Sequence, residues 1–313
     1  SLHDALPISI TSGIDRFITG EGSSDTYFVI VNVNVQSLAA HARDISTDRH
    51  LSRAQMLVLT ETWMHVASPP VVIDRFEMKQ QSPCQKRSGG VALYKQQTAN
   101  YSVMPLSHTR EHPTATGPRN ATEFRDLLLS KPHTTRSHPA DIIISRVHLP
   151  TNNLTFILVA VYIHQKSAYS TQEDSLKRSL REYSDLVPNG DTDIPMIIMG
   201  DFNTTSQNRE KLTEFLKNHL NLTLKNNPEE ATTLGSSCID LTFSRHLDLH
   251  CKPYVSYFSY HRPIFNRIRT NSKMQTAPLR PSVVHESIRM EISRTSEEQV
   301  PMGTGSTHDN STI

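Results

Sequence analysis

Short apolar runs recur along the chain, and each run stops abruptly at polar residues. Such runs, rich in β-branched residues and bounded by turn-forming residues, are typical of buried strands. We therefore predict strands over residues 27–33, 56–59, 91–94, 141–149, 154–162, 196–199, 239–243 and 255–260. The run at residues 196–199 continues directly into the sequence GDFN.

Helical spacing of apolar residues occurs between some of these strands. Ser37 is suited to cap a helix that follows the first strand. A second capping sequence begins at Thr171 and precedes apolar residues at helical spacing. A third helix is predicted over residues 210–219, with Leu212 and Leu216 on its inner side.

Three segments lack a core pattern. We expect residues 1–25 to be a flexible leader, residues 105–140 a surface insertion, and residues 269–313 a disordered tail. Residues 26–268 would then form the single folded domain. The hydrophobic share of 36% is low for a globular chain, and we expect the deficit to lie in these segments.

Composition excludes several classes of protein. The 32 basic and 31 acidic residues give a formal charge of +1, so net charge provides no argument for nucleic-acid binding. The three cysteines are odd in number and lack CxxC spacing, which argues against a disulfide framework or a zinc ribbon. No apolar run is long enough to span a bilayer, and the first residues do not resemble a secretory signal. We expect an intracellular protein, nuclear or cytoplasmic, with no membrane partner.

Polar residues follow several of the predicted strands directly. Asp201 and Asn203 lie two residues apart after the central strand, so extended geometry would point them to the same side. Glu61 follows the strand at residues 56–59, and Asn34 lies where the first strand changes to a helix. Buried carboxylates need a compensating cation or donor, and Mg²⁺ is a cation that such oxygen ligands suit.

Two further residues suggest a catalytic pair. Asp240 lies within a predicted strand, where aspartate is disfavoured unless it has a partner. A carboxylate beside His261 would fix the tautomer of its imidazole and stabilise the charged form.

Each of these residues also has an ordinary structural interpretation. Asp201, Asn203 and Asn34 are typical of turns that leave a strand. Glu61 could form a salt bridge with a lysine or arginine, and Tyr162 at the end of its strand could serve only for packing.

Seven markers occur in a fixed order along the chain: Asn34, TETW with Glu61, GGVALY, the strand ending at Tyr162, GDFN, IDLTF with Asp240, and the segment with His261. This ordered set resembles the endonuclease/exonuclease/phosphatase superfamily, which includes apurinic/apyrimidinic endonucleases, pancreatic-type deoxyribonucleases and inositol-phosphate 5-phosphatases. The sequences NVQSL, LTETW and CIDLTFSR are most similar to endonuclease modules of non-LTR retrotransposons and Helitron-like elements. The resemblance covers roughly residues 27–268 and implies a four-layered α/β sandwich of two packed mixed β-sheets flanked by helices.

The resemblance also implies a role for each marker residue. Glu61 and Asn34 would hold a divalent metal, Mg²⁺ or Mn²⁺. Asp201 would orient or deprotonate the attacking water, and Asn203 and Tyr162 would contact the phosphate. The His261–Asp240 pair would act at the scissile phosphate. The implied activity is Mg²⁺-dependent hydrolysis of a phosphodiester by a DNA endonuclease of mobile-element origin.

One position departs from the family pattern. The family usually has Asp-His where this chain has Tyr260-His261. Tyrosine is larger, neutral and a poor Mg²⁺ ligand, so a weakened or inactive nucleic-acid-binding remnant is an alternative to an active nuclease. A phosphatase acting on small phosphoesters is a second alternative, because the core motifs do not exclude it.

Overall fold

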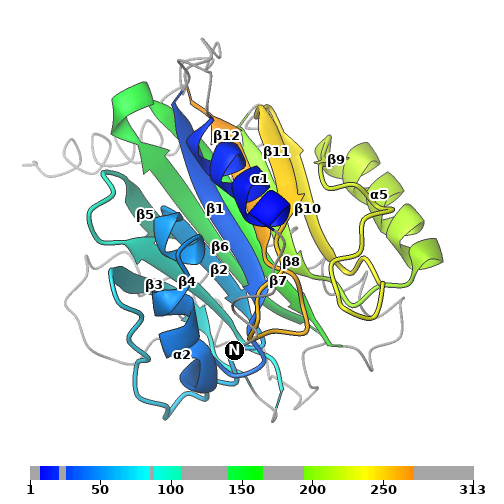
Figure 1. The fold of residues 1–313 in the computed structure, drawn as a ribbon. Coiled ribbons are helices and arrows are strands. Elements are labelled where there is room, and N and C mark those ends of the chain that lie inside the picture. Colours follow the sequence, from blue (N-terminus) through cyan, green and yellow to red (C-terminus); the bar gives the residue numbers. More distant parts are fainter. Residues whose placement is uncertain (1–7, 21–25, 85–87, 107–139, 165–193, 271–313) are drawn as a thin grey trace, which may run out of the picture. The chain divides into compact units, whose positions relative to one another are not determined.

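The computed structural model describes residues 8–20, 26–84, 88–106, 140–164 and 194–270. They form two six-stranded β-sheets that pack face to face (Figure 1). Both sheets are mixed, so the predicted sandwich of two mixed sheets is confirmed. All three cysteines are free, as the sequence indicated.

The first sheet contains the first predicted strand at its centre. Its strands, in spatial order, are β11 (Leu249–Pro253), β12 (Ile264–Arg269), β1 (Tyr27–Asn34), β2 (Met56–Thr60), β4 (Val91–Gln96) and β3 (Phe76–Ser82). Strands β1 and β2 are parallel, and the other neighbours are antiparallel.

The second sheet contains the run that leads into GDFN. Its strands, in spatial order, are β5 (Ser102–Pro105), β6 (Ala140–Leu149), β7 (Leu154–Ile163), β8 (Met196–Asp201), β10 (Asp240–Arg245) and β9 (Thr223–Leu224). Strands β6 and β7 form the predicted hairpin, closed by the short 3₁₀ helix η3 (Pro150–Asn152). Strands β7 and β8 are parallel, so their carboxyl ends meet at one edge.

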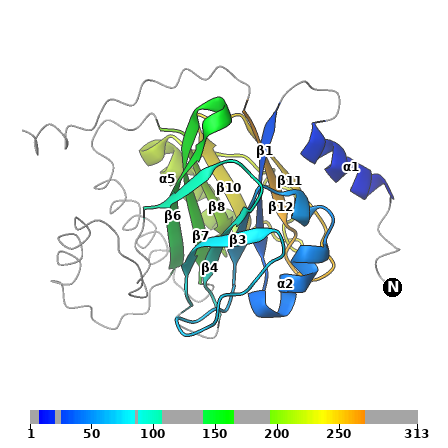
Figure 2. The same ribbon diagram turned by 90° about the vertical axis from the view of Figure 1, so that its left-hand side faces the viewer.

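Helices cover the outer faces of the sheets (Figure 2). The helix α2 (Leu38–Thr47) begins after its cap Ser37 and packs its buried residues on the first sheet. It is followed by the 3₁₀ helix η2 (Leu51–Arg53). The helix α5 (Ser206–Leu220) packs Leu212 and Leu216 on the second sheet, as predicted. The inner faces meet between the sheets, where Phe28 of β1 lies against Phe156 of β7.

The expectation of a flexible leader does not hold for residues 8–19. They form the helix α1 (Ile8–Thr19), which lies on β1 and β12 (Figure 1). Ile14 is buried in the core of the first sheet, with Phe17 and Ile18 packed against it. These three residues have the spacing of one helix face, a pattern that the glycine and polar residues nearby concealed.

The predicted strand over residues 255–260 is wrong, because this segment is an irregular loop between β11 and β12. Its aromatic residues pack individually rather than in strand alternation: Tyr254 is buried and Phe258 packs against the core. Pro253 and Pro263, which carry no amide hydrogen, flank the loop. The predicted helix near Thr171 and nearly all of the insertion and the tail lie outside the described residues.

Candidate active site

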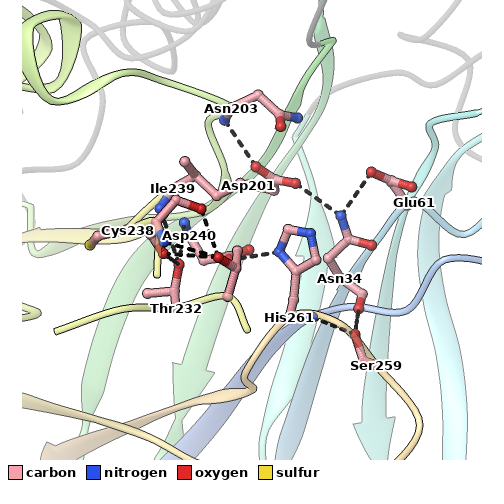
Figure 3. A network of polar contacts seen from close by, with 12 residues as sticks. Asn34, Glu61, Asp201, Asn203, Thr232, Cys238, Ile239, Asp240, Ser259 and His261 are labelled. Carbon is pink, nitrogen blue, oxygen red and sulfur yellow. Dashed lines mark hydrogen bonds and ion pairs between the residues drawn. The ribbon is translucent and has the colours of Figure 1, made fainter. Parts of the chain in front are cut away.

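The polar marker residues meet where the two sheets present their strand ends. Asn34 ends β1, Glu61 follows β2, Asp201 ends β8 and Asp240 begins β10. His261 lies just before β12 and forms a single β-bridge with Thr233. Figure 3 shows these side chains pointing toward one another from separate elements.

Asn34 connects the two sheets. Its amide Nδ2 donates hydrogen bonds to Glu61 Oε1 and Asp201 Oδ2, each at 2.9 Å. Its Oδ1 accepts the backbone N–H of Gln36 at 3.1 Å, which fixes the direction of the amide. In this geometry Asn34 presents hydrogens, not an oxygen, to the two carboxylates. Its role in a metal site would therefore be to hold the carboxylates rather than to bind the ion.

Glu61 has an unusual backbone. Its φ of 50° lies in the left-handed region, which is uncommon for glutamate and is found at functional sites. The Glu61 carbonyl accepts the backbone N–H of Ser37 at 2.9 Å, so this bend is tied to the cap of α2. The carboxylate also accepts the Tyr162 hydroxyl at 3.2 Å. Glu61 forms no ion pair with any lysine or arginine among the described residues. For these residues, the interpretation of Glu61 as a salt-bridge partner is therefore excluded.

Asp201 and Asn203 do not form the extended pair that their spacing suggested. Asn203 has a φ of 45°, and its backbone N–H donates to Asp201 Oδ1 at 2.9 Å, so the segment is a turn. The Asn203 side-chain amide donates to the carbonyl of Ile163 at 2.7 Å. Asp201 therefore ends its strand in a turn, and its carboxylate still faces Asn34 in the group of marker residues (Figure 3).

Gly200 is required by a close contact rather than by an exit from the strand. It lies within β8 with a φ of 147°, and a Cβ there would be 1.8 Å from the carbonyl oxygen of Val161. The absent side chain lets β8 approach β7 closely beside Asp201.

Asp240 and His261 form the predicted pair. Asp240 Oδ2 lies 2.8 Å from His261 Nδ1, and both residues are buried. Thr232 Oγ1 accepts the backbone N–H groups of Ile239 and Asp240, each at 3.1 Å. Ser259 Oγ accepts the N–H of His261 at 3.0 Å and donates to the Asn34 carbonyl at 2.6 Å.

Burial and charge shift the acid–base properties of the site. Burial, together with the negative charge of Asp240, raises the pKa of Asp201 to about 8. Burial alone would lower the pKa of His261, but the hydrogen bond and charge of Asp240 outweigh it and raise this pKa to about 9. Burial and the nearby carboxylates raise the pKa of Tyr162, so its hydroxyl remains a donor. His261 is therefore an imidazolium at neutral pH.

The donor set fits a hard divalent cation. Glu61, Asp201 and Asp240 provide carboxylate oxygens, and Asp240 Oδ1 is buried with no hydrogen-bond partner among the described residues. The ligand atoms of Asp201, Asp240 and His261 lie within 4.8 Å of one another. Burial and, after it, the charge of Asp240 raise the pKa of Asp201, so its ionised form is costly without a compensating cation. Since a charged imidazole does not bind metal, the Glu61 side of the cluster suits the cation best.

Tyr260 does not replace the missing carboxylate in the cluster. Its side chain is 46% exposed, and its hydroxyl oxygen lies next to Gly235, where a Cβ would be 1.9 Å away. The ring contacts that of His261 edge to face, with centroids 5.9 Å apart. This position therefore provides a neutral phenol that points toward Gly235 and no carboxylate.

Sequence reasoning missed several supporting residues. Thr232 and Ser259 fix the loops that carry Asp240 and His261, but isolated hydroxyl residues give no signal in a single sequence. Asp141 is also buried: it accepts the N–H of Gly90 at 2.8 Å and lies 3.4 Å from His164 Nε2. Its position opposite Tyr162 in the β6–β7 hairpin is the one sequence feature that could have identified it.

A family model described as "Endonuclease-reverse transcriptase" matches residues 156–265. This range runs from β7 to the start of β12 and includes Tyr162, Asp201, Asn203, Asp240 and His261. A search of curated proteins found no match.

Solved structures share the fold at low sequence identity. The endonuclease domain of TRAS1, a telomere-specific non-LTR retrotransposon, has 16% identity and a TM-score of 0.50, over 79% of this chain and 100% of that chain. The human Nocturnin catalytic domain has 14% identity and a TM-score of 0.51, over 78% and 96%. An endonuclease/exonuclease/phosphatase family protein from Bacteroides thetaiotaomicron has 11% identity and a TM-score of 0.50, over 80% and 100%. The family model matches less than half of the chain, and the solved structures share its fold. The chain is therefore similar to retrotransposon endonucleases and to endonuclease/exonuclease/phosphatase family proteins.

Proposed function

We propose that the protein is a divalent-metal-dependent phosphodiesterase that acts as a DNA endonuclease. The observation that carries this proposal is the convergence of three carboxylates and one imidazolium in a single buried cluster. Phosphodiester hydrolysis needs a base for the water, donors for the phosphate oxygens and stabilisation of the leaving group. The cluster offers a candidate for each.

Asp201 is the candidate base. With a pKa of about 8, Asp201 is mostly protonated at neutral pH in the absence of a cation, and a bound cation would favour its ionised form. That ionised carboxylate is a stronger proton acceptor than an ordinary aspartate, which suits the deprotonation of water. The N–H groups of Asn34 and Asn203 hold its two oxygens in place.

His261 is the candidate donor to the phosphate. Because Asp240 occupies Nδ1, the proton on Nε2 is left to face the substrate. Asn203 has a second amide hydrogen, beyond the one it donates to the Ile163 carbonyl, that could serve as a further donor. Tyr162, whose hydroxyl hydrogen is donated to Glu61, would contact the phosphate from beside the same carboxylates.

Glu61, held by Asn34 and Tyr162, would bind the divalent cation on its side of the cluster. When bound, such an ion neutralises charge that develops on the phosphate and polarises it for attack. Mg²⁺ or Mn²⁺ suits these oxygen ligands.

The DNA substrate is inferred from similarity. The matching family model is described as an endonuclease with reverse transcriptase, and one structural neighbour is a retrotransposon endonuclease domain. Both support nucleic acid over a small phosphoester as the substrate.

None of the helices in the described part of the chain has the length and apolar character needed to span a membrane.

The test is nicking of supercoiled plasmid in Mg²⁺ by the full chain. We expect Asp201→Ala and His261→Ala to reduce nicking by about 10²-fold or more, because each removes a group that acts in the transition state. The matched controls are Asp248→Ala and His250→Ala, which remove an exposed Asp–His pair with atoms 3.0 Å apart on the first sheet. Equal nicking by the wild type and the two cluster variants would exclude the proposal.

The exposed position of Tyr260 favours one second candidate, a catalytically weakened remnant that still binds nucleic acid. The variant Tyr260→Asp distinguishes the two. A large gain in nicking would identify a damaged enzyme, whereas efficient nicking by the unaltered chain would rule out the remnant.

A further inference from the structure

Two large apolar side chains lie exposed beside the buried cluster. Tyr260 directly precedes His261 and is 46% exposed, and Leu234 is 56% exposed. We refer to Tyr260 and Leu234 as the apolar lip. Single exposed apolar residues are common on proteins, but two held together at the edge of a polar site need an explanation.

Backbone hydrogen bonds hold the lip in a fixed position. The N–H of Leu234 donates to the Tyr260 carbonyl at 3.0 Å, and the N–H of Arg262 donates to the Thr232 carbonyl at 2.7 Å. The bridge between Thr233 and His261 lies between these two bonds. The two loops that carry the lip are therefore joined on both sides of His261.

Gly235 fixes the position of the Tyr260 ring. A Cβ at Gly235 would lie 1.9 Å from the Tyr260 hydroxyl oxygen and 3.2 Å from its Cζ, so the phenol fills the space that a side chain would take. The ring meets the His261 ring edge to face at 75°. The aromatic group is thus ordered, next to the imidazole and open to solvent.

We propose that the apolar lip contacts an unpaired base next to the phosphate bound by His261, with the base stacked on Tyr260. This inference rests on the proposed function and names the part of the substrate that lies beside the phosphate. Every base has a π-face, so stacking on an exposed aromatic tolerates any sequence. A neutral phenol also avoids the repulsion that a carboxylate would exert on the phosphate backbone.

The test measures binding of the full chain to a short fluorescein-labelled oligothymidylate in EDTA by fluorescence anisotropy. We expect Tyr260→Ala to weaken binding about fivefold or more, and Tyr260→Phe to stay within about twofold of the wild type, because the ring supplies the stacking. The matched control is Tyr257→Ala, which removes a tyrosine that is 43% exposed in the same loop but makes no ring contact with His261.

A second probe separates stacking from mere support of His261. An oligonucleotide of the same length with abasic sugars should bind the wild type more weakly than oligothymidylate, and this preference should vanish in Tyr260→Ala. Leu234→Ala, which leaves the ring in place, should reduce the preference only in part.

The outcomes distinguish this inference from the proposed function. Three results would each overturn the inference that a base stacks on Tyr260, whatever the nicking assay gives. They are equal binding by the wild type and Tyr260→Ala, equal losses in Tyr260→Ala and Tyr257→Ala, and no oligonucleotide binding by the wild type. If Tyr260→Ala loses binding while the wild type shows no nicking, the result would contradict the proposed function and support base stacking on Tyr260.

Discussion

At the scale of single residues, the cluster at the strand ends contains more carboxyl groups than positively charged groups. Glu61, Asp201 and Asp240 are all buried, and one imidazolium faces them. Asn34 offsets part of the repulsion by donating to two of the carboxylates. Such a site is costly to the protein without a cation and well suited to bind one, because buried charges are usually paired or bound to a metal.

The charge state of His261 depends on Asp240, and this gives a prediction. In Asp240→Asn we expect the pKa of His261 to fall from about 9, because burial, which lowers it, is no longer outweighed. The imidazole would then lose its charge at a lower pH, and nicking at neutral pH should fall about 10²-fold or more. An NMR titration of the histidine ring protons measures the shift.

The control for this variant is Asp248→Asn, which removes the partner of the exposed His250. It should leave the titration of His261 and the nicking rate unchanged. A His261 titration that is the same in the wild type and Asp240→Asn would contradict the assignment.

At the scale of elements, a second polar cluster attaches α1 to the rest of the fold. Asp15 of α1 forms ion pairs with Arg49 and Arg53, the latter at 2.7 Å, on the segment after α2. His50 is buried beside it, 3.5 Å from Asp15 and 3.3 Å from the Tyr254 hydroxyl. Helix α1 is thus held by charge as well as by Ile14.

Burial lowers the pKa of His50 below its ordinary value of 6.5, despite the nearby carboxylates. The unfolded chain therefore takes up a proton at this residue before the folded chain does. The neutral, buried His50 therefore makes its full contribution to the free energy of unfolding above pH 6.5. This contribution is lost as pH falls through the lower folded-state pKa of His50.

We predict that urea unfolding will show the wild-type free energy of unfolding falling between pH ~7.5 and ~5.5, and falling less in His50→Gln. His250→Gln, at a position that is 59% exposed, should keep the wild-type dependence. A pH dependence that is unchanged in His50→Gln would show that this histidine is not buried in its neutral form.

Elements also mark where sequence reasoning succeeded and where it failed. Buried strands such as β7 and β8 were predictable, because continuous apolar runs have few other stable arrangements. Helix α1 was missed because the nearby glycine and polar residues concealed the helix-face spacing of its apolar residues. The loop before His261 was predicted wrongly because its aromatic residues pack individually against the core. The spacing of apolar residues in the sequence does not indicate such individual contacts.

At the scale of the whole molecule, the two sheets bring together residues from opposite ends of the described chain. Parallel pairing of β1 with β2 and of β7 with β8 places Asn34, Glu61, Tyr162 and Asp201 at strand ends. The positions of these polar residues after apolar runs predicted that they would lie close together, and the structure brings them together. It could not predict that Asn34 donates to both Glu61 and Asp201, because that depends on the packing of one sheet on the other.

The packing also explains why a departure at one position need not abolish the rest of the site. Tyr260 points toward Gly235 and leaves the Asp240–His261 pair intact. Metal affinity is then expected to depend on the Glu61 side of the cluster, since Tyr260 provides no carboxylate beside His261.

The initial rate of plasmid nicking against Mg²⁺ concentration, for the wild type and Glu61→Gln, tests the central claim most directly. The account predicts a saturable rate for the wild type that EDTA abolishes, and a curve for Glu61→Gln displaced to at least about tenfold higher Mg²⁺. The control Glu77→Gln, at a side chain that is 55% exposed, should follow the wild-type curve. Nicking that persists in EDTA, or identical curves for the wild type and Glu61→Gln, would contradict it.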